Sequence, residues 1–382
     1  MKPIRVLNIV GAMNRGGAET WLLNVLRCID RERFHLDFLV HTVRCAAYDG
    51  KIRSLGSRTI PCPRPRNTIG YVRRLRRILQ ENGPYDVVHS HVHHFSGVAL
   101  RVAHAMGVPM RIAHSHSDTS WVQARAGWAR RTYLRLMKQW IQRYATCGLA
   151  ASEMAAIALW GRGWRMDPRW QVLHCGIDLS AFSAGVSSAG VRGEIGIPED
   201  AYVLGHVGSI NPVKNHRFLL EIAAKAMGLA GNIWLLLIGD GPLRAAVEEQ
   251  SVGMGIRDRV IFAGLRDDVP RLLMGAVDVF LLPSLFEGLP LVAVEAQAAG
   301  LPVVVSDTVT PEVDVVPGLL TWLSLSQPAS AWAEASLEAR SKRHRIPQRV
   351  ACMVLDRSSF SIQNCVARLE SQYTDKDAEI VD

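Results

Sequence analysis

Short runs of apolar residues alternate along the chain with longer segments in which apolar positions recur every three or four residues. In the first half, the apolar runs lie at 5–10, 35–41, 86–91 and 110–115, with helical spacing near 17–29, 69–82 and 96–106. A second series of runs lies at 203–208, 234–238, 260–264, 277–283 and 301–307. Strands that alternate with helices predict parallel sheets with crossover helices. We therefore expect an α/β fold with doubly wound sheets.

The chain of 382 residues is longer than one hydrophobic core usually supports, so we expect two domains. A glycine turn at Gly176, followed by Ser, Ala and Gly residues up to Arg192, is typical of a crossing between domains. The predicted domains are residues 1–180 and 193–350. Residues 355–373 have the spacing of one last amphipathic helix.

Composition indicates a soluble enzyme, with 48% hydrophobic and 21% charged residues. No stretch reaches the roughly 18 uncharged apolar residues that a membrane span needs, and the first residues do not form a signal peptide. The seven cysteines show no C-x-x-C spacing, which argues against a disulfide framework and a cysteine zinc site. We expect a cytoplasmic protein with free thiols.

Positive charge is concentrated in the first half of the chain. Residues 1–190 contain 27 Lys and Arg against 11 Asp and Glu, whereas the remainder carries a net charge of −7. Basic and aromatic residues mix between Trp121 and Tyr144, as in a helix that lies on anionic lipid at the inner face of the plasma membrane. A helix that covers a sheet has the same pattern, so both interpretations stay open. No nucleic-acid-binding motif accompanies the charge, and we expect no nucleic-acid partner.

Two glutamates eight residues apart, Glu287 and Glu295, follow an apolar run and a Gly-Leu-Pro turn. This order predicts a strand, a glycine turn and a helix, with Glu287 in the loop at the carboxyl end of the strand, where open α/β sheets bind ligands. Glu295 would lie about two turns into the helix. Carboxylates accept strong hydrogen bonds from vicinal diols, and the helix N-terminus attracts phosphate.

Two further glycine turns each connect a predicted strand to a helix. The segment 11–20 contains Gly16 and Gly17 and offers free amides to an anion, although it has neither a P-loop nor a dinucleotide fingerprint. The segment 208–216 contains Lys214, which would lie beside a diphosphate. For each segment, a turn without a ligand is the alternative.

Seven of the thirteen histidines fall between positions 89 and 116, and all of them except His104 lie in two clusters that each end a predicted strand. One interpretation is a metal site, but only Asp86 and Asp118 could add acidic ligands nearby. In another interpretation, His91 is a polar contact or proton acceptor beside the reacting sugar. Most of the seven histidines are explained by packing at strand ends, and we expect no metal site.

Together these motifs resemble the "group 1" family of retaining, nucleotide-sugar-dependent glycosyltransferases, and the match spans nearly the whole chain. The similar segments are Gly16–Glu19, His89–His91, His114–His116, Gly176–Asp178, Pro212–His216, Gly239–Pro242 and the glutamate pair. The branch that builds bacterial capsules and exopolysaccharides is the most similar. The resemblance implies the GT-B architecture, in which two Rossmann-like domains enclose an interdomain cleft and a terminal helix returns to the first domain.

The resemblance also implies roles for individual residues. Glu287 would bind hydroxyls of the donor sugar, Glu295 the ribose diol, Lys214 the departing diphosphate, and His91 would lie near the anomeric carbon. The backbone of Gly264, Leu265 and Arg266 would hold the base, and Gly208, Ser209, Gly288, Leu289 and Pro290 would line the donor. Gly16, Gly17 and His114 would lie on the acceptor or phosphate side. The implied substrates are a nucleoside diphosphate sugar, most simply a UDP-sugar, and a saccharide or lipid-linked acceptor, with no cofactor and no required metal.

Two positions depart from the family pattern. Ser209 stands where an arginine commonly helps the lysine to hold the diphosphate, and Arg217 or Arg15 could supply the missing charge. Cys175 stands where asparagine is usual. Two alternatives remain at this point: a metal-dependent hydrolase built on the histidine clusters, and a sugar-nucleotide-binding protein without catalysis, for which Ser209 is the argument.

Overall fold

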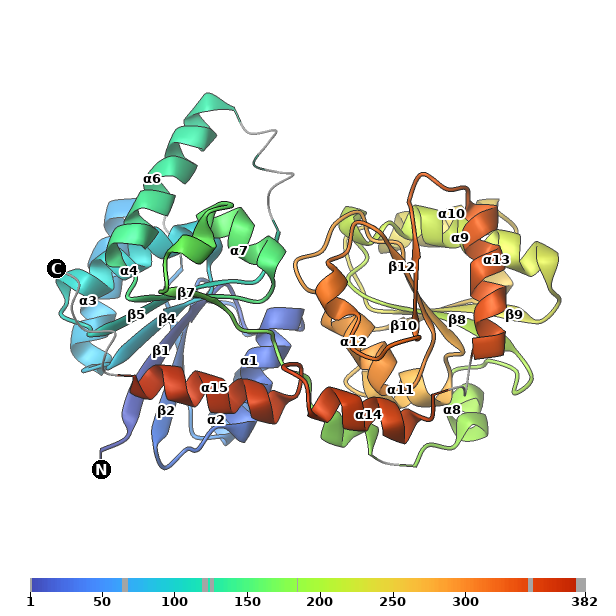
Figure 1. Cartoon of the computed structure of the whole chain (residues 1–382), viewed down its shortest axis with the longest axis horizontal. Helices are drawn as coiled ribbons and strands as arrows, with labels where there is room; N and C mark the ends of the chain where they lie inside the picture. The colour runs from blue at the N-terminus through green and yellow to red at the C-terminus, as the bar shows by residue number, and fades with distance from the viewer. Residues whose placement is uncertain are drawn as a thin grey trace. The chain divides into compact units, whose positions relative to one another are not determined.

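The computed structural model describes residues 2–63, 68–118, 123, 127–183, 185–342 and 346–375. The chain divides into two compact units (Figure 1). Unit 1 consists of Met1–Gly176 and Ile362–Asp382, and unit 2 consists of Ile177–Ser361. Each unit is an α/β body around a parallel sheet.

Unit 1 contains a seven-stranded sheet in the order β3-β2-β1-β4-β5-β6-β7. Every neighbouring pair of strands is parallel. The strands are β1 (Ile4–Val10), β2 (Phe34–Val40), β3 (Thr59–Pro61), β4 (Val87–Ser90), β5 (Met110–Ser115), β6 (Cys147–Ala150) and β7 (Trp170–Val172). The helices are α1 (Gly17–Cys28), α2 (Asp49–Ser54), α3 (Thr68–Asn82), α4 (Ser96–Ala105), α6 (Trp128–Tyr144), α7 (Glu153–Trp160) and α15 (Ile362–Thr374).

Unit 2 contains a six-stranded parallel sheet in the order β10-β9-β8-β11-β12-β13. Its strands are β8 (Tyr202–Val207), β9 (Ile233–Ile238), β10 (Val260–Gly264), β11 (Val279–Leu282), β12 (Val303–Ser306) and β13 (Leu320–Leu323). Its helices are α8 (Ser188–Glu194), α9 (His216–Leu229), α10 (Arg244–Gly253), α11 (Val269–Gly275), α12 (Leu291–Ala298), α13 (Ala329–Glu338) and α14 (Gln348–Asp356). The apolar runs of the sequence are these strands, and the α/β expectation is confirmed.

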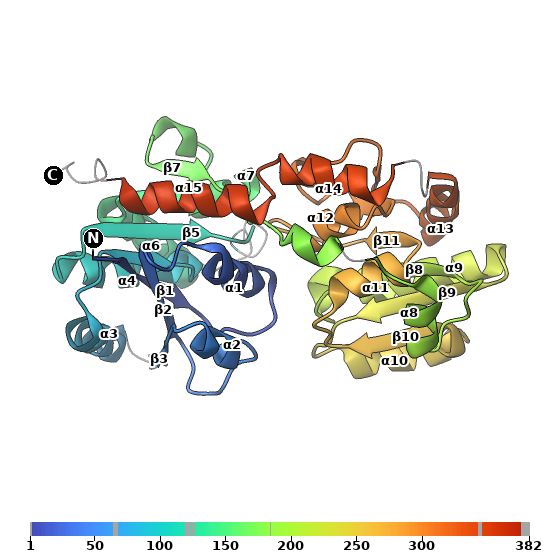
Figure 2. The same ribbon diagram turned by 90° about the horizontal axis from the view of Figure 1, so that it is seen from below.

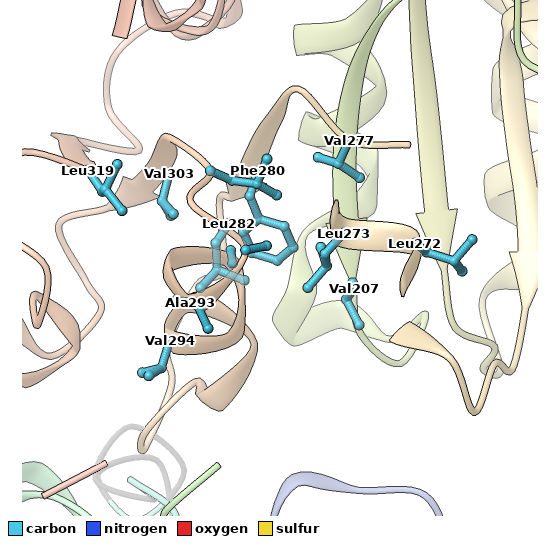
Figure 3. Close-up of a cluster of buried hydrophobic side chains, with 14 of the residues drawn as sticks. Val207, Leu272, Leu273, Val277, Phe280, Leu282, Ala293, Val294, Val303 and Leu319 are labelled. Carbon is cyan, nitrogen blue, oxygen red and sulfur yellow. The ribbon is translucent and has the colours of Figure 1, made fainter. Parts of the chain in front are cut away.

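The core of unit 2 forms because both faces of its sheet are covered by helices, so its strands are apolar throughout. On one face, Phe280 and Leu282 of β11 pack with Leu273 of α11 and Ala293 of α12 (Figure 3). All four side chains are fully buried. This packing fixes α12, and therefore the loop in front of it, against the carboxyl end of β11.

Each sheet has one point at which successive strands of the chain stop adding to one side and start adding to the other. This switch point lies between β1 and β4 in unit 1 and between β8 and β11 in unit 2. In open parallel sheets, the loops that diverge at such a point leave a crevice at the carboxyl ends of the strands, where ligands bind. In unit 2 the loop after β8 contains Lys214, and the loop after β11 contains Glu287.

The C-terminal segment differs from the expected single helix over 355–373. Two helices form instead, because α14 ends at Asp356 and α15 begins at Ile362. The Ser358 side chain donates to the Leu355 carbonyl (2.7 Å) and accepts from the Phe360 amide (3.1 Å), so it competes with the helical ladder. The backbone of Phe360 then accepts a hydrogen bond from the Ile177 amide.

Helix α15 packs within unit 1 although it comes from the end of the chain (Figure 2). Its Glu370 accepts a hydrogen bond from the Asp30 amide (2.9 Å), and its Cys365 accepts one from the Trp21 indole (3.3 Å). Tyr373 lies beside the Phe34 ring. The last helix is thereby joined to α1 and to the start of β2.

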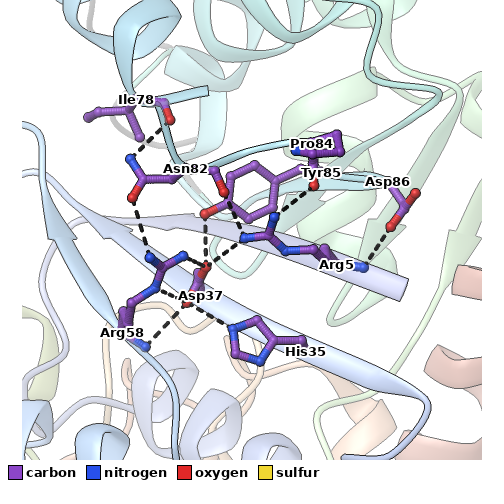
Figure 4. A network of polar contacts seen from close by, with 9 residues as sticks. All are labelled: Arg5, His35, Asp37, Arg58, Ile78, Asn82, Pro84, Tyr85 and Asp86. Atoms are coloured by element: carbon purple, nitrogen blue, oxygen red, sulfur yellow. Dashed lines mark hydrogen bonds and ion pairs between the residues drawn. The ribbon is translucent and has the colours of Figure 1, made fainter. Parts of the chain in front are cut away.

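Two of the basic residues in the first half of the chain, Arg5 and Arg58, contact a buried carboxylate of unit 1 (Figure 4). Asp37 of β2 is fully buried, and it accepts hydrogen bonds from Arg58 (2.6 Å) and Tyr85 (2.8 Å). The Arg5 guanidinium lies 3.8 Å from the same carboxylate and donates to the Asn82 carbonyl. Burial alone would raise the pKa of Asp37, but these hydrogen bonds outweigh it and the pKa is lowered.

We expect Asp37→Asn to lower the free energy of unfolding by roughly 3 kcal/mol at pH 7, because it removes the buried anion that Arg5, Arg58 and the buried Tyr85 contact. Since the pKa of Asp37 is lowered on folding, its contribution is complete above the ordinary value of 3.8 and is lost as the pH falls through the folded value. The difference between variant and wild type should therefore shrink in acid.

Urea unfolding at several pH values measures this difference. Glu32→Gln, which removes an exposed carboxylate from the same unit, is the control and should stay within about 0.5 kcal/mol of wild type. A loss for Asp37→Asn no larger than that of the control would contradict the assignment.

Candidate functional site

Lys214 lies at the end of a short turn that follows β8. The turn is the 3-10 helix η4 (Pro212–Lys214), which the Asn211 side chain caps by accepting from the amides of Val213 (3.0 Å) and Lys214 (3.3 Å). Asn215 adopts a left-handed backbone conformation (φ 55°) and is the N-cap residue of α9. The local sequence thus holds the Lys214 backbone in one position.

The loops at the carboxyl ends of β8, β9 and β10 lie backbone against backbone. The Gly239 amide donates to the Gly264 carbonyl (2.8 Å), and a Cβ atom at Gly239 would overlap the carbonyl of Gly208. A Cβ atom at Gly241 would overlap the backbone of Ile210 in the same way. Glycine is required at both positions because the chains approach this closely.

Lys214 and Glu287 form an ion pair at the switch point of the unit 2 sheet. The Lys214 Nζ donates to Glu287 Oε1 at 2.5 Å, and the two side chains are only 15% and 13% exposed. The Leu285 amide also donates to the Val213 carbonyl (2.8 Å), which joins the two loops directly. The structure therefore brings together the cation and the carboxylate that the sequence places 73 residues apart.

Glu295 lies little more than one turn into α12, and not two turns as expected, because the helix begins only at Leu291. Its carboxylate has no hydrogen-bond or ion-pair partner among the residues that the structure describes. The side chain is half-buried. Burial raises the pKa of Glu295 to about 7 from its ordinary value of 4.5. An acceptor with unused lone pairs and no neutralising cation can bind a pair of hydroxyl groups.

The remaining donor-side residues predicted from the sequence lie around these groups in unit 2. Gly288, Leu289 and Pro290 form the end of the loop before α12, whose N-cap residue is Pro290. Gly264 ends β10 with φ 67°, and Leu265 beside it is 53% exposed. Arg266 donates to Asp268 (2.8 Å) and to Glu194 (2.9 Å), so its side chain is held by two carboxylates.

Ser209 leaves Lys214 without an arginine at the neighbouring position. Arg217, one of the two proposed substitutes, is 81% exposed and pairs with Glu221 one turn further along α9. The other, Arg15, belongs to unit 1. In unit 2 as described, Arg217 therefore does not take the place of the missing arginine beside Lys214.

Four histidines gather at the carboxyl ends of β4 and β5 in unit 1. The two strands are parallel with Ser90 opposite Ala113, so alternate residues of both strands lie on the same face of the sheet. His89 Nε2 lies 3.1 Å from His114 Nδ1, and His91 Nδ1 lies 2.9 Å from His116 Nε2.

Contacts from other elements complete this histidine cluster, which we define as His89, His91, His114 and His116. Tyr373 of α15 bonds to His89 Nδ1 (2.8 Å), Asn8 Oδ1 bonds to His91 Nε2 (3.2 Å), and Cys175 Sγ lies 3.6 Å from His116 Nδ1. The Trp21 ring meets the His114 ring edge-on at 5.2 Å. Both ring nitrogens of His91 are therefore hydrogen-bonded, one to His116 and one to Asn8.

Burial is the main cause that lowers the pKa values of these histidines. The pKa values of His89, His91 and His114 lie well below 6.5, and that of His116 is lowered to about 3. All four rings are therefore neutral near pH 7. A neutral ring with both nitrogens engaged is a poor proton acceptor, which disfavours the general-base role considered for His91.

The glycine turn before α1 is the last predicted anion site. Helix α1 begins at Gly17 with Gly16 as its N-cap residue, and no side chain caps it. Burial raises the pKa of Glu19 in the first turn, and a hydrogen bond from its own amide acts against that rise. The Glu19 carboxylate thus lies at the helix N-terminus where the sequence predicts an external anion.

Comparisons with known proteins decide the family. The family model described as "Glycosyltransferase Family 4" matches residues 15–181, and that described as "Glycosyl transferases group 1" matches residues 201–339. The putative glycosyltransferase EpsF of Bacillus subtilis is 39% identical over 359 residues, which cover 92% of this chain and 93% of that protein. This chain is a group 1 glycosyltransferase.

Solved structures show the same fold over nearly the whole length of this glycosyltransferase. The Anabaena protein Alr3699/HepE in complex with UDP and glucose has a TM-score of 0.80 at 20% identity, with 97% of this chain and 99% of that chain covered. WaaG, a glycosyltransferase of lipopolysaccharide biosynthesis, has a TM-score of 0.75 at 19% identity, with 97% and 100% covered. The fold is GT-B, with two Rossmann-like domains.

Membership in this family confirms glycosyl transfer from a nucleotide sugar. It favours neither alternative raised from the sequence, the metal-dependent hydrolase or the protein without catalysis. Among the described residues, no helix is long and apolar enough to cross a membrane.

Several residues at these sites belong to no motif, so the sequence of this glycosyltransferase does not predict their place there. Asn8, Trp21, Cys175 and Tyr373 all contact the histidine cluster, yet they come from four separate segments. The only hint was that Cys175 departs from the family pattern. In unit 2, His206 lies buried next to Gly208, its Nε2 atom has no partner among the described residues, and no motif marks it.

We expect Glu295→Gln to gain stability relative to wild type as the pH rises from 5 to 8. The folded protein keeps the Glu295 proton up to about pH 7 and the unfolded chain loses it near 4.5, so wild-type stability falls between these values. Glutamine removes that fall, and the relative gain should be about 2 kcal/mol.

Urea unfolding of both proteins across this pH range measures the gain. Glu334→Gln, on the exposed face of α13 in the same unit, is the matched removal of a carboxylate. If the difference between Glu295→Gln and wild type stays constant with pH, the carboxyl group does not carry the raised pKa.

Proposed function

We propose that this enzyme transfers a hexose or N-acetylhexosamine from a UDP-sugar to a sugar hydroxyl of a lipid-linked or oligosaccharide acceptor. The transfer retains the anomeric configuration and serves the synthesis of a cell-surface polysaccharide. The observation that carries the proposal is the ion pair between Lys214 and Glu287 at the switch point of unit 2. It places a cation for a diphosphate beside a carboxylate for sugar hydroxyls.

The relatives support the choice of substrates. EpsF of Bacillus subtilis is similar over almost the whole chain. An Escherichia coli enzyme described as UDP-Gal:alpha-D-GlcNAc-diphosphoundecaprenol alpha-1,3-galactosyltransferase is 33% identical over 147 residues, which cover 37% of this chain and 38% of that enzyme. That enzyme uses a UDP-sugar and a lipid-linked acceptor, and Alr3699/HepE was solved with UDP-glucose.

Each donor-side group has a role in the proposed reaction. Lys214 neutralises charge on the departing diphosphate, and the amides at the N-terminus of α12 add the positive end of the helix dipole. Glu287 binds hydroxyls of the transferred sugar, and Glu295 binds the ribose diol. The acceptor attacks from the face of the leaving group, and a diphosphate oxygen takes the proton of the acceptor hydroxyl, so no covalent enzyme intermediate forms.

The proposed transfer requires no metal ion. Lys214 and the α12 N-terminus supply at the diphosphate the electrostatic stabilisation that a divalent cation supplies elsewhere. In unit 1, His91 contributes as a neutral polar group held in place by Asn8 and His116, and Gly16 and Gly17 belong to the acceptor side. Full activity in the presence of a chelator is the expected result.

We expect Lys214→Ala to lower kcat for sugar transfer by about 10²- to 10³-fold, because it removes the cation that meets the leaving group. Glu287→Ala should cause a loss of similar size, since it removes the carboxylate that holds the sugar. Turnover is measured on a panel of UDP-, GDP- and ADP-sugars with a chelator present, and NMR of the product gives its anomeric configuration.

Arg217→Ala is the control for these variants, because this exposed cation lies three residues from Lys214 and pairs with Glu221. Its turnover should match wild type. Wild-type turnover in Lys214→Ala or Glu287→Ala would overturn the site assignment, and an inverted product would overturn the retaining mechanism.

We also propose that α6 binds anionic membrane surfaces. The helix contains five basic residues and no acidic one, and Arg130, Arg131 and Arg135 are exposed. Trp128 is 83% exposed and Leu136 is 41% exposed, whereas Leu134, Met137 and Ile141 pack into the core. Trp121 and Arg125, which belong to the same sequence pattern, lie outside the described residues. The exposed mixture of cations and apolar groups suits a lipid headgroup layer.

Reversing Arg130, Arg131 and Arg135 to glutamate should weaken binding to vesicles rich in phosphatidylglycerol by about 10²-fold or more, at about 1 kcal/mol for each basic residue. The same charge change at Arg73, Arg76 and Arg77 on the exposed face of α3 is the matched control. Sedimentation with anionic and with neutral vesicles measures binding. Equal losses in both triple variants would show that net charge, and not α6, causes attachment.

A further inference from the structure

We propose that His114, His116 and Cys175 form a binding site for a thiophilic divalent cation of the zinc class. Each residue offers one ligand atom, and the three atoms all lie within 4.8 Å of one another. They come from the end of β5 and from the segment after β7, which are separated by 59 residues between His116 and Cys175. This site lies in unit 1, and the proposed transfer requires no ion in it.

The spacing of the donor atoms suits such an ion. The Cys175 Sγ atom lies 3.6 Å from His116 Nδ1. A tetrahedral zinc ion with bonds of about 2.3 Å to sulfur and about 2.0 to 2.1 Å to nitrogen holds these two atoms roughly 3.6 Å apart. The separation therefore fits a shared ion as well as it fits a weak hydrogen bond from the thiol.

His114 supplies the second argument, because one of its nitrogens has no use in the fold. The side chain is fully buried, and its Nε2 atom has no hydrogen-bond partner in the described part of the chain. Its Nδ1 atom is held by His89 Nε2 (3.1 Å). A buried ring nitrogen without a partner is costly unless it carries a lone pair that binds something.

The other nitrogen of each proposed histidine ligand is held by a second histidine, as is usual around metal sites. Asn8 Oδ1 accepts from His91 Nε2, so His91 Nδ1 accepts from His116 Nε2 and leaves the lone pair of His116 on Nδ1. On the other side, the Tyr373 hydroxyl can donate or accept, so His89 is able to accept from His114 Nδ1 and donate to the Tyr373 oxygen. An ion bound to His114 Nε2 selects this arrangement, in which the lone pair of His114 lies on Nε2. Both lone pairs belong to the proposed ligand atoms.

The alternative triad of His89, His91 and His114 also has ligand atoms within 4.8 Å of one another. Both nitrogens of His89 and of His91, however, are already used to hold the rings to each other, to Asn8 and to Tyr373. A metal ion there would break these hydrogen bonds. The set with Cys175 keeps all of them and loses only the contact between the thiol and His116.

Binding replaces the Cys175 S–H bond by a bond from sulfur to the metal, and the proton leaves to solvent. Two neutral imidazoles and one thiolate are nitrogen and sulfur ligands, which suit zinc better than magnesium or calcium. Three protein ligands leave a fourth position open. His116 is the half-buried member of the set and marks the side from which an ion enters.

The test uses the full-length enzyme, freed of metal with a chelator and titrated with Zn²⁺ by calorimetry and with Co²⁺ by absorption. We expect a single saturable Zn²⁺ per chain, proton release on binding, and a thiolate-to-cobalt charge-transfer band. Cys175→Ser should remove the band, and both Cys175→Ser and His114→Ala should abolish saturable binding. His89→Gln should weaken it by about 10- to 100-fold, because it loosens the His114 ring.

Cys62→Ser, a buried thiol elsewhere in unit 1, is the control for binding to scattered thiols and should bind like wild type. Circular dichroism and thermal melting of each metal-free variant show whether it folds. The cobalt band of the wild type needs no variant, so its absence overturns the proposal by itself. Unchanged binding in a folded Cys175→Ser protein, or an equal loss in Cys62→Ser, also overturns it.

Discussion

The contact between Lys214 and Glu287 depends on the order of strands in the second sheet. The residues are 73 positions apart, and they meet because β8 and β11 are hydrogen-bonded neighbours whose carboxyl ends send their loops to the same edge. Burial of Phe280 and Leu282 against α11 and α12 holds the second loop there. The distance of 2.5 Å between Lys214 Nζ and Glu287 Oε1 therefore depends on packing in the core of unit 2 and not only on the two residues themselves.

The two partners neutralise each other in the structure without a ligand. A diphosphate that approaches Lys214 competes with the Glu287 carboxylate for the same ammonium group, and a carboxylate left alone at 13% exposure would lose solvation. Hydroxyl groups of a bound sugar can replace the lost lysine contact as hydrogen-bond donors. In the proposed roles of these residues, a donor that carries both diphosphate and sugar would satisfy both groups at once, whereas a nucleotide without sugar would satisfy only the lysine.

The features that depend on local patterns of residues, namely the buried strands and the loops that follow them, could be predicted from the sequence. Apolar runs such as 203–208 and 260–264 predicted buried parallel strands, and glycine turns after them placed Lys214 and Glu287 at strand ends. The ion pair could not be predicted, because it needs the strand order and not only the strands. The break between α14 and α15 was missed because one serine side chain competes with the helix. The excess of positive charge was interpreted as a ligand surface, although Arg5 and Arg58 serve a buried aspartate.

The histidine cluster is a second case in which the sequence does not show which side chains meet. The sequence argument against a metal there rested on the lack of nearby acidic residues, and it noted Cys175 only as a departure from the family pattern. The fold brings Cys175 to His116 from another strand end, and it uses His89 and His91 to orient the two outer rings. The proposed ligand set consists of neutral rings and a thiol, so a count of carboxylates near the motif does not test for it. What matters is which nitrogens remain free after the rings have bonded to each other, and only the structure shows that.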